Sequence, residues 1–484
     1  MFAGNIEALA APLRGGAAAL ATLAAIMLAC GPTASDDRPD LLLVVLDTVR
    51  ADAVSALGGR PGITPNLDAL AVSGLLYTRA FAAGPWTLPS HASLFTGLRL
   101  DQHGVGIRGR VTVPDPVVTL AEFLREAGYE TVGLSENPLV SSHFNMTQGF
   151  DEFAARSGGA AGEGDLDVVR RLEHWAKTRA RERPFLLFVN LFDAHFPYAV
   201  RSDNPYLPPG VSAREAAEVK QSAFRICDRL PPRRELEILK GLYLGEVASV
   251  DAKLGMILEL LRDAGLSERL LVLVTSDHGE HFGERRLMEH QFSVSNRLLN
   301  VPLVVHGLPG IEPAVIGTPV SLEDVVPSVL EWTGLPVLPG LSGQLLPTRA
   351  DDPTAERSLF AGYSDRERAD WPEAAGGRAL ARIPAVMRAG CGPEERAHGE
   401  MLALTRYPFK LIWFEHYPSE LYDLSWDAGE GSNLASIQGD VAKRLEPELL
   451  RFIEENQVLT PVSDQLGELD PEAEALLRKL GYIE

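Results

Sequence analysis

The chain has 484 residues, of which 66 are acidic and 45 basic, so its formal charge at neutral pH is −21. This length suits one large domain plus a smaller one, and the acidic balance without a long basic run argues against nucleic acid as a partner. The three cysteines, Cys30, Cys227 and Cys391, lack metal-site spacing and allow at most one intramolecular disulfide.

The first thirty residues are typical of an export signal. Arg14 precedes an apolar, alanine-rich run over residues 17–29, which is short for a membrane span. Met27-Leu28-Ala29 before Cys30 is similar to a bacterial lipobox, with Met27 in place of the usual leucine. We therefore expect residues 1–30 to be a signal peptide, Cys30 to become a lipidated N-terminus, and residues 31–39 to form a polar linker. An ordinary cleaved signal or an uncleaved anchor is the alternative.

These features predict a protein that leaves a bacterial cytoplasm. Its destination would be the periplasm or the cell surface, with attachment to the membrane through lipidated Cys30. No later stretch of the sequence has the length and apolar character of a membrane helix.

From residue 41 the chain alternates between short apolar runs and helix patterns. Strands are predicted at 41–46, 130–135, 185–191, 270–275 and 301–306, and the continuous apolar runs at 41–46 and 270–275 are typical of strands buried on both faces. Helix patterns open at Thr64-Pro65 and cover 120–124, 166–181, 234–262 and 322–332. We expect an α/β domain over residues 40–350, with a mainly parallel sheet flanked by helices.

The stretch from Pro85 to Gly97 predicts a helix that begins close to Thr87. Pro89 suits a first helical turn, and Gly97 suits the position just past the end. Free N–H groups and the helix dipole at such an end favour an anion or a hydroxyl that becomes an alkoxide. A threonine that only caps the helix is the structural alternative.

Acids and histidines follow three of the predicted strands. Asp47 follows the first, Asp193 and His195 follow the run at 185–191, and Asp277-His278 follows the run at 270–275. Ligands bind beyond the carboxyl ends of strands in such sheets. Asp47, Asp277 and His278 are therefore candidate ligands for zinc, manganese, magnesium or calcium, with the oxygen of Thr87 as a fourth.

Two further histidines are candidates for substrate chemistry. His195 and His290 are expected to hold the oxygens of the substrate or to protonate a leaving alcohol. A metal ion would lower the pKa of the Thr87 hydroxyl and make it a nucleophile. The remaining histidines to which we assign structural roles are His103, His143, His281 and His306.

Eight motifs follow one another along the chain: Leu46–Asp52, Thr64–Asp68, Pro85–Gly97, Ser276–Glu280, Val301–Val304, Pro319–Asp324, Glu420–Leu424 and Asn433-Leu434. Taken together and in this order, they resemble the sulfatase family of the alkaline phosphatase superfamily. The resemblance covers about residues 40 to 435. It implies a metal-dependent ester hydrolase whose large α/β domain is followed by a small C-terminal α+β subdomain, here 351–460. Strands within 403–414 and a helix over 441–454 would belong to that subdomain.

Residues 461–484 lie outside the region of resemblance and are predicted to form an acidic tail. A short amphipathic helix is expected there over about 471–480.

The sequence departs from the family pattern at two places. Many sulfatases have a second aspartate after the first, where this chain has Thr48. Sulfatases also oxidise a cysteine or serine to formylglycine within a Cys/Ser-x-Pro-x-Arg pattern, whereas the aligned residues here are Thr87-Leu88-Pro89-Ser90-His91. Threonine is not a substrate of that maturation. His91, in place of the arginine, joins Thr87, His195 and His290 as a candidate catalytic residue.

A threonine at this position resembles other branches of the superfamily, in which it attacks phosphorus. These are nucleotide pyrophosphatase-type phosphodiesterases and bacterial phosphoethanolamine or glycerol-phosphate transferases. We predict a metal-dependent hydrolase of an anionic sulfate or phosphate ester, with the phosphoester favoured because water reaches phosphorus more easily than sulfur in a covalent Thr87 ester. A phospho-group transferase and a catalytically inactive surface binding module are the alternatives.

Overall fold

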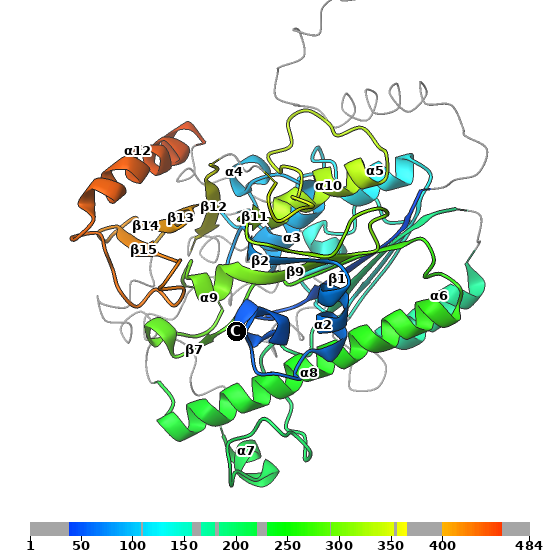
Figure 1. Ribbon diagram of the computed structural model, residues 1–484, viewed down its shortest axis with the longest axis horizontal. Helices are drawn as coiled ribbons and strands as arrows, with labels where there is room; N and C mark the ends of the chain where they lie inside the picture. The colour runs from blue at the N-terminus through cyan, green and yellow to red at the C-terminus, as the bar shows by residue number, and fades with distance from the viewer. Residues whose placement is uncertain are drawn as a thin grey trace, which may run out of the picture.

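The computed structural model describes residues 38–107, 110–156, 166–179, 183–219, 230–290, 292–352, 356–364 and 399–456. A large sheet with helices on both faces stands beside a small antiparallel sheet (Figure 1). The predicted signal peptide, Cys30 and the acidic tail lie outside these ranges. Within them, no helix is both long enough and apolar enough to span a bilayer.

The large sheet is mixed but mainly parallel. Its strands are β1 (Asp40–Leu46), β2 (Leu75–Phe81), β3 (Glu130–Ser135), β4 (Glu152–Ala155), β5 (Phe185–Leu191), β6 (Leu270–Thr275), β9 (Asn300–His306), β10 (Ala314–Ile316) and β11 (Val320–Ser321). They run in the order β10-β2-β9-β6-β1-β5-β3-β4, with β11 also on β2. Only β9 is antiparallel to its neighbours, β2 and β6. The predicted fold class is confirmed.

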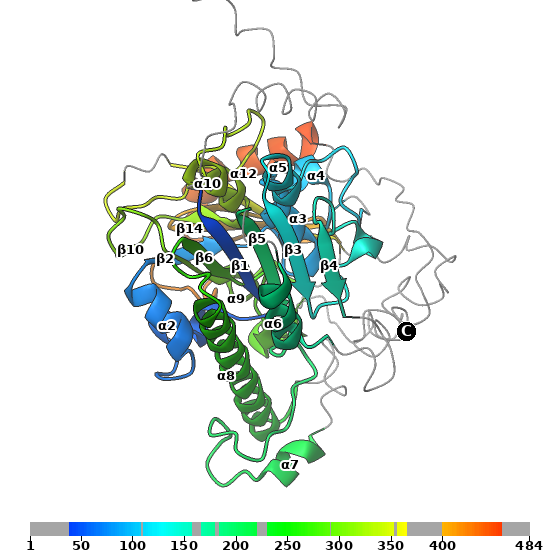
Figure 2. The ribbon, with the colours of Figure 1, turned by 90° about the vertical axis from the view of Figure 1, so that its right-hand side faces the viewer.

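Helices cover both faces of this sheet. They are α2 (Pro65–Val72), α3 (Thr87–Thr96), α4 (Leu100–His103), α5 (Leu120–Glu126), α6 (Val168–Thr178), α7 (Ala213–Glu218), α8 (Arg233–Asp263), α9 (Asn296–Leu299) and α10 (Val325–Trp332). In Figure 2, α5 and α10 lie on one side of the sheet, and α2, α6 and α8 lie on the other.

The central strand β1 shows why the apolar runs are continuous. Leu41, Leu43 and Val45 belong to the core that includes α3, α5 and α10. The alternate residues Leu42, Val44 and Leu46 belong to the core that includes α2, α6 and α8. Because successive side chains of a strand point to opposite faces, a strand between two helical layers has no polar face.

The small sheet lies beside the large one and is formed by the C-terminal part of the chain. It consists of β12 (Leu359–Tyr363), β13 (Met401–Arg406), β14 (Phe409–Phe414) and β15 (Glu420–Asp423), and α12 (Gly439–Glu455) packs on it. The rings of Phe360 and Phe452 stack with centroids 4.2 Å apart. The strands and helix expected here from the sequence are present, whereas the domain division at residue 350 stays a prediction.

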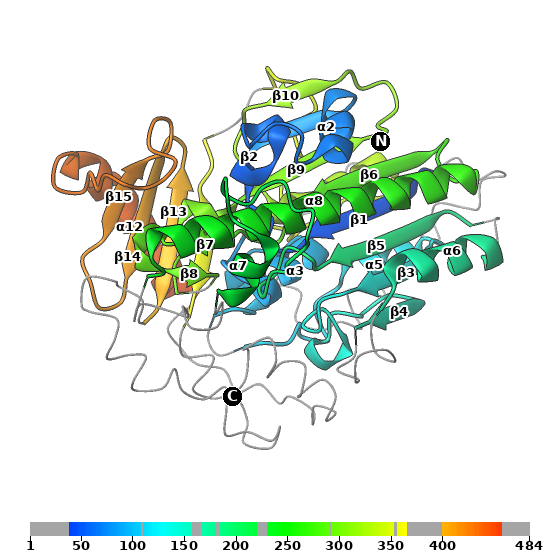
Figure 3. The ribbon, with the colours of Figure 1, turned by 90° about the horizontal axis from the view of Figure 1, so that it is seen from below.

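The topology brings the predicted strand ends together. Strand β1 pairs in parallel with β5 on one side and with β6 on the other. Asp47, which follows β1, therefore lies at the same edge as His195 after β5 and Asp277 after β6. Figure 3 shows α3 below this part of the sheet, with a two-stranded hairpin, β7 (His281–Phe282) and β8 (Met288–Glu289), nearby.

A candidate metal centre at the carboxyl edge of the sheet

Thr87 is the first residue of α3, as the sequence predicts. Trp86 precedes it in extended conformation, and Gly97 ends the helix with a left-handed φ of 66°. The first turn is fixed by Pro89, which packs so closely that a Cβ on Gly84 or Gly106 would lie 2.5 or 2.4 Å from its ring. No side chain caps this helix end. Thr87 therefore does not cap the helix, and the structural alternative for this residue is wrong.

Three buried ligand atoms converge beside this helix end. Asp47 Oδ1, Asp277 Oδ2 and His278 Nε2 are buried and have no hydrogen-bond partner within the described chain. Ligand atoms of the same three residues all lie within 4.8 Å of one another. Buried polar atoms without partners are uncommon in folded proteins, and a shared cation would satisfy all three.

The other atoms of these side chains are held by neighbours. Asp47 Oδ2 accepts a hydrogen bond of 2.6 Å from Asn137 Nδ2. Asp277 Oδ1 accepts from the backbone N–H groups of Thr48 and His278, at 3.2 and 2.9 Å. His278 Nδ1 lies 2.9 Å from the carbonyl oxygen of Gly279 and so carries the proton. His278 Nε2 is then the unprotonated nitrogen that a metal ion requires.

The pKa shifts of Asp47, Asp277 and His278 favour a bound cation. Burial, and then the carboxylate of Asp277, raises the pKa of Asp47 well above its usual range. Burial raises the pKa of Asp277 to about 7 and lowers the pKa of His278. Two buried carboxylates so close together are costly without a cation between them. Two carboxylate oxygens and one neutral imidazole therefore fit a divalent metal ion.

The hydroxyl of Thr87 lies next to this group. Its Oγ1 accepts a hydrogen bond of 3.1 Å from Asn137 Nδ2, the same amide that contacts Asp47. The Thr87 side chain also opposes the rise in the pKa of Asp277. The hydroxyl is thus bonded to the amide that holds Asp47 and lies close to a second candidate ligand.

His91 is a neutral part of the same cluster. Its Nδ1 lies 3.0 Å from the carbonyl oxygen of Thr87 and 3.5 Å from Asp277 Oδ2. Its Nε2 lies 3.3 Å from the amide nitrogen of Asn190 and accepts from it. Burial lowers the pKa of His91 to about 3, so the ring stays uncharged near neutral pH. His91 holds the turn of Thr87 in place and adds no positive charge.

The two remaining candidate histidines extend the cluster. The ring of His290 lies 4.4 Å from that of His278 and 4.9 Å from that of His195, between centroids. His290 Nδ1 faces Glu280 Oε1 at 3.3 Å, and Tyr198 donates to the other oxygen of Glu280 at 3.2 Å. All seven residues proposed from the sequence, Asp47, Thr87, His91, His195, Asp277, His278 and His290, thus belong to one connected cluster. Their individual roles stay predictions.

Three residues of the cluster were missed from the sequence: Asn137, Asn190 and Glu280. Asn137 follows β3, so the rule that pointed to Asp47 could have found it. Asn190 is a polar residue in the otherwise apolar β5, which is itself a signal because buried polar groups need partners. Glu280 ends the Ser276–Glu280 motif, of which only Asp277 and His278 are predicted as site residues from the sequence.

Other polar residues near the strand ends have structural partners. Asp193 forms an ion pair of 2.7 Å with Lys253, which also contacts Glu136. Three of the histidines assigned structural roles contact serines: His103 with Ser93, His281 with Ser295 and His306 with Ser73.

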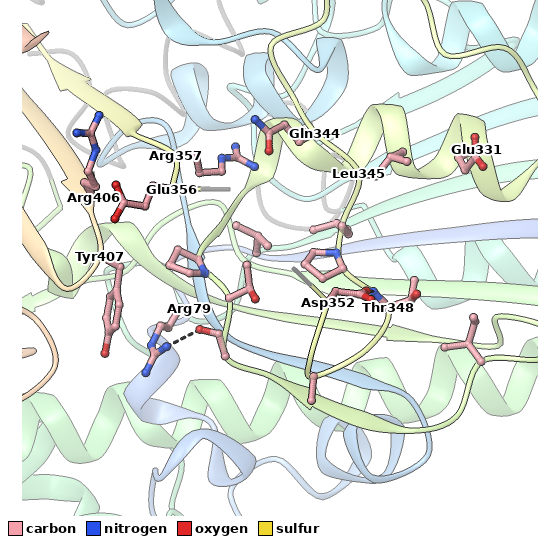
Figure 4. Close-up of a pocket in the computed structure, with 18 of the residues that line it drawn as sticks. Arg79, Glu331, Gln344, Leu345, Thr348, Asp352, Glu356, Arg357, Arg406 and Tyr407 are labelled. Carbon is pink, nitrogen blue, oxygen red and sulfur yellow. Dashed lines mark hydrogen bonds between the residues drawn. The ribbon is translucent and has the colours of Figure 1, made fainter. Parts of the chain in front are cut away.

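A separate cavity of about 810 Å³ lies at the outer edge of the large sheet (Figure 4). Arg79, Trp332, Asp352 and Tyr407 are among the residues that line it, and none of the seven candidate residues does. The guanidinium of Arg79 lies 3.9 Å from the ring centre of Tyr407 and donates to the carbonyl oxygen of Gly317. The candidate metal centre is thus not part of this cavity.

The chain is similar to sulfatases and to a hydrolase of phosphonate esters. A family model described as Sulfatase matches residues 39–335. Arylsulfatase K of Danio rerio is 24% identical over 87% of this chain and 84% of its own. The phosphonate monoester hydrolase of Agrobacterium radiobacter has a TM-score of 0.66 at 23% identity, covering 88% of this chain and 100% of its own. A protein solved with its substrate, D-glucosamine-2-N,6-O-disulfate, has a TM-score of 0.63 at 18% identity, covering 87% and 97%.

Proposed function

The chain belongs to the sulfatase family of hydrolases, and we propose that it is a metal-dependent hydrolase of an anionic ester in which unmodified Thr87 is the nucleophile. One observation carries this proposal. The Thr87 hydroxyl lies at the start of α3 and shares the amide of Asn137 with Asp47, one of three residues whose unpartnered buried atoms converge. A binding module that had lost its chemistry would have no need of such a costly arrangement.

Asp47, Asp277 and His278 would hold the metal ion, with Thr87 Oγ1 as a fourth ligand. When bound, the ion would supply positive charge that lowers the pKa of the Thr87 hydroxyl and offsets the charge of the substrate. We propose zinc or manganese ahead of calcium or magnesium, because an imidazole ligand suits the former and the latter prefer oxygen ligands alone.

The surrounding side chains would each have a separate role in the reaction. Thr87 Oγ1 would release its proton to solvent and then attack the central atom of the ester, while the amide of Asn137 donates to the same oxygen and stabilises the alkoxide before the new bond forms. The bond from the central atom to the leaving oxygen breaks, and His290 gives that oxygen a proton. Glu280 orients His290 through Nδ1. In the second step water attacks the covalent Thr87 ester and restores the hydroxyl.

We infer that the central atom is phosphorus. A formylglycine hydrate has a second hydroxyl that expels sulfate by elimination, and a threonine ester has none. The covalent ester of Thr87 must be opened by water at the central atom, which is easier at phosphorus. The names of similar proteins include both sulfate and phosphonate esters, so the chemistry at Thr87, not likeness, decides this preference.

A substrate screen tests the proposed function. We expect the purified full-length protein, loaded with manganese or zinc, to hydrolyse p-nitrophenyl phosphodiesters and phosphonate monoesters at least about tenfold faster than p-nitrophenyl sulfate, in kcat/KM. The same preparation treated with a chelator is the control and should be inactive.

Faster turnover of aryl sulfate would contradict the phosphoester preference and leave a sulfate ester as the substrate. A protein that binds no metal and turns over none of these esters would instead be the inactive binding module. Transfer of the phosphoryl group to an added alcohol in preference to water would identify the transferase.

We also propose that the protein is exported and attached to a membrane through Cys30. The expected result is that full-length protein fractionates with membranes and that Cys30→Ala releases it or blocks its maturation. Cys227→Ala is the matched control and should leave the fractionation unchanged. If the Cys30→Ala protein stays in the membrane fraction, then lipidation at Cys30 is not what holds it there.

A further inference from the structure

A buried ion pair links the small sheet to the segment that follows β15. Lys410 on β14 is 0% exposed and Glu430 is 6% exposed, with Lys410 Nζ 2.6 Å from Glu430 Oε1. A buried ammonium and carboxylate lose their hydration, so the pair is expensive unless both groups are fully bonded. A methionine would fill the same space in a core at lower cost. The other contact of Lys410 suggests why a lysine is used.

Lys410 Nζ also donates to a loop of the large domain. Its hydrogen bond of 2.6 Å goes to the carbonyl oxygen of Val294. We call residues 284–290 and 292–295 the His290 loop, because they carry His290 between the β7 strand and α9. Lys410 therefore joins the small sheet to the segment that brings His290 to the metal centre.

The His290 loop has a backbone that needs such support. Arg285, Arg286, Glu289 and Phe292 have φ values of 53°, 59°, 62° and 57°, in the left-handed region. Residues other than glycine adopt this region at a cost, and they keep it only where the surrounding contacts enforce it. Four such residues in one short loop imply that contacts from outside the loop fix its shape.

The small sheet supplies several of those contacts, and in Figure 3 the β7–β8 hairpin lies beside it. Arg285 donates to Glu420 at 2.9 Å and to the hydroxyl of Tyr422 at 2.8 Å, both on β15. The ring of Phe292 lies 5.7 Å from that of Tyr363 on β12. The only one of these contacts that is a buried hydrogen bond to the loop backbone is the one from Lys410.

We propose that Lys410 and Glu430 are positioning residues that hold the His290 loop, and thereby set His290 against His278 and His195. Glu430 fixes the ammonium of Lys410, and Lys410 fixes the carbonyl oxygen of Val294. The small sheet is then part of the catalytic apparatus although none of its described residues belongs to the metal centre. The catalytic reading of this role rests on the proposed function, in which His290 protonates the leaving group.

The first test is the double variant Lys410→Met with Glu430→Gln, which removes the tether, while Arg285, 3.9 Å from Glu430, keeps its hydrogen bond to Glu420. We expect kcat to fall about 10- to 100-fold, with KM changed less than about threefold and metal content unchanged. Hydrogen exchange should rise in the peptide over residues 284–299 and stay unchanged in β1 and β6. Leu411→Ala is the control, since it damages the core under α12 and leaves the tether in place.

A double-mutant cycle with His290→Ala distinguishes a positioning role of Lys410 from general damage to the fold. In the His290→Ala background the double variant should cost less than about twofold further, because the side chain it positions is already gone. An equal loss in both backgrounds, or unchanged exchange over 284–299, would overturn the proposal. If the wild-type protein hydrolyses no ester, the proposed function fails, and the exchange comparison still decides whether Lys410 holds the loop.

Discussion

Thr87→Ala is expected to reduce turnover of the best substrate by at least about a thousandfold, because it removes the atom that forms the covalent intermediate. Thr87→Ser keeps a hydroxyl at the start of α3 and should retain about a tenth of the activity or more. Peptide mass spectrometry should find Thr87 unmodified in the active wild-type protein. Steady-state kinetics of the three proteins at equal metal content is the measurement.

Thr96→Ala is the matched control for this truncation. Thr96 is buried at the other end of the same helix, and its hydroxyl donates to the carbonyl oxygen of Ala92 and accepts from the backbone N–H of Leu98, just past the helix. Its loss should therefore leave kcat nearly unchanged. Asn137→Ala should fall between the two, with a loss of about 10- to 1,000-fold. A Thr87→Ala protein that keeps more than a tenth of the activity would show that another group attacks the ester.

Asp277→Asn should abolish both metal binding and activity, because the neutral amide replaces an anionic ligand of the same shape. The metal-free variant should nevertheless be more stable than metal-free wild type at neutral pH. Burial raises the pKa of Asp277 from 3.8 to about 7 in the folded protein, so the folded state without metal binds a proton more tightly than the unfolded state. The stability that metal-free wild type gains from this proton on Asp277 is complete below pH 4 and is lost as the pH rises to 7.

The gain in unfolding free energy for Asp277→Asn should therefore grow over this pH window, to at most about 4 kcal/mol. Manganese or zinc should reduce and then abolish this difference, since a ligand stabilises the folded wild type by about 2.7 kcal/mol at a hundred times its Kd and by about 4.1 kcal/mol at a thousand times, and the variant has lost this site. Thermal unfolding with and without metal, alongside metal analysis, measures both effects. Asp440→Asn, an exposed site on α12, is the control. Full metal occupancy in Asp277→Asn would show that the ligand assignment is wrong.

The parts of the site that sequence reasoning reached are those with local patterns. Asp47 and Asp277 each follow an apolar strand run, and the rule for open α/β sheets places such residues together. Thr87 stands in a proline–glycine frame that predicts a helix start. These signals come from a few neighbouring residues, so they can be read without knowing the rest of the fold.

The parts that were missed depend on tertiary contacts. Asn137 matters because one amide reaches both Asp47 and Thr87, and its place after β3 could have marked it as a candidate but not shown these two contacts. The same holds for Lys410, whose partner Val294 is 116 residues away in sequence. The short strands β4, β10 and β11 also went unrecognised, because two to four residues carry too little periodicity to distinguish a strand from a loop.

The place of β1 in the middle of the large sheet has a consequence for how the chain folds. The first strand to be synthesised pairs with β5 and β6, and the backbone contact from Thr48 to Asp277 joins residues 229 positions apart. Loop closure of this size makes assembly slow, and the nascent chain has no partner for one side of β1 until residue 275 has been made. We therefore expect the large sheet to close around β1 only after the residues of β6 have been synthesised, so that its central strand is also the one that waits longest for its neighbours.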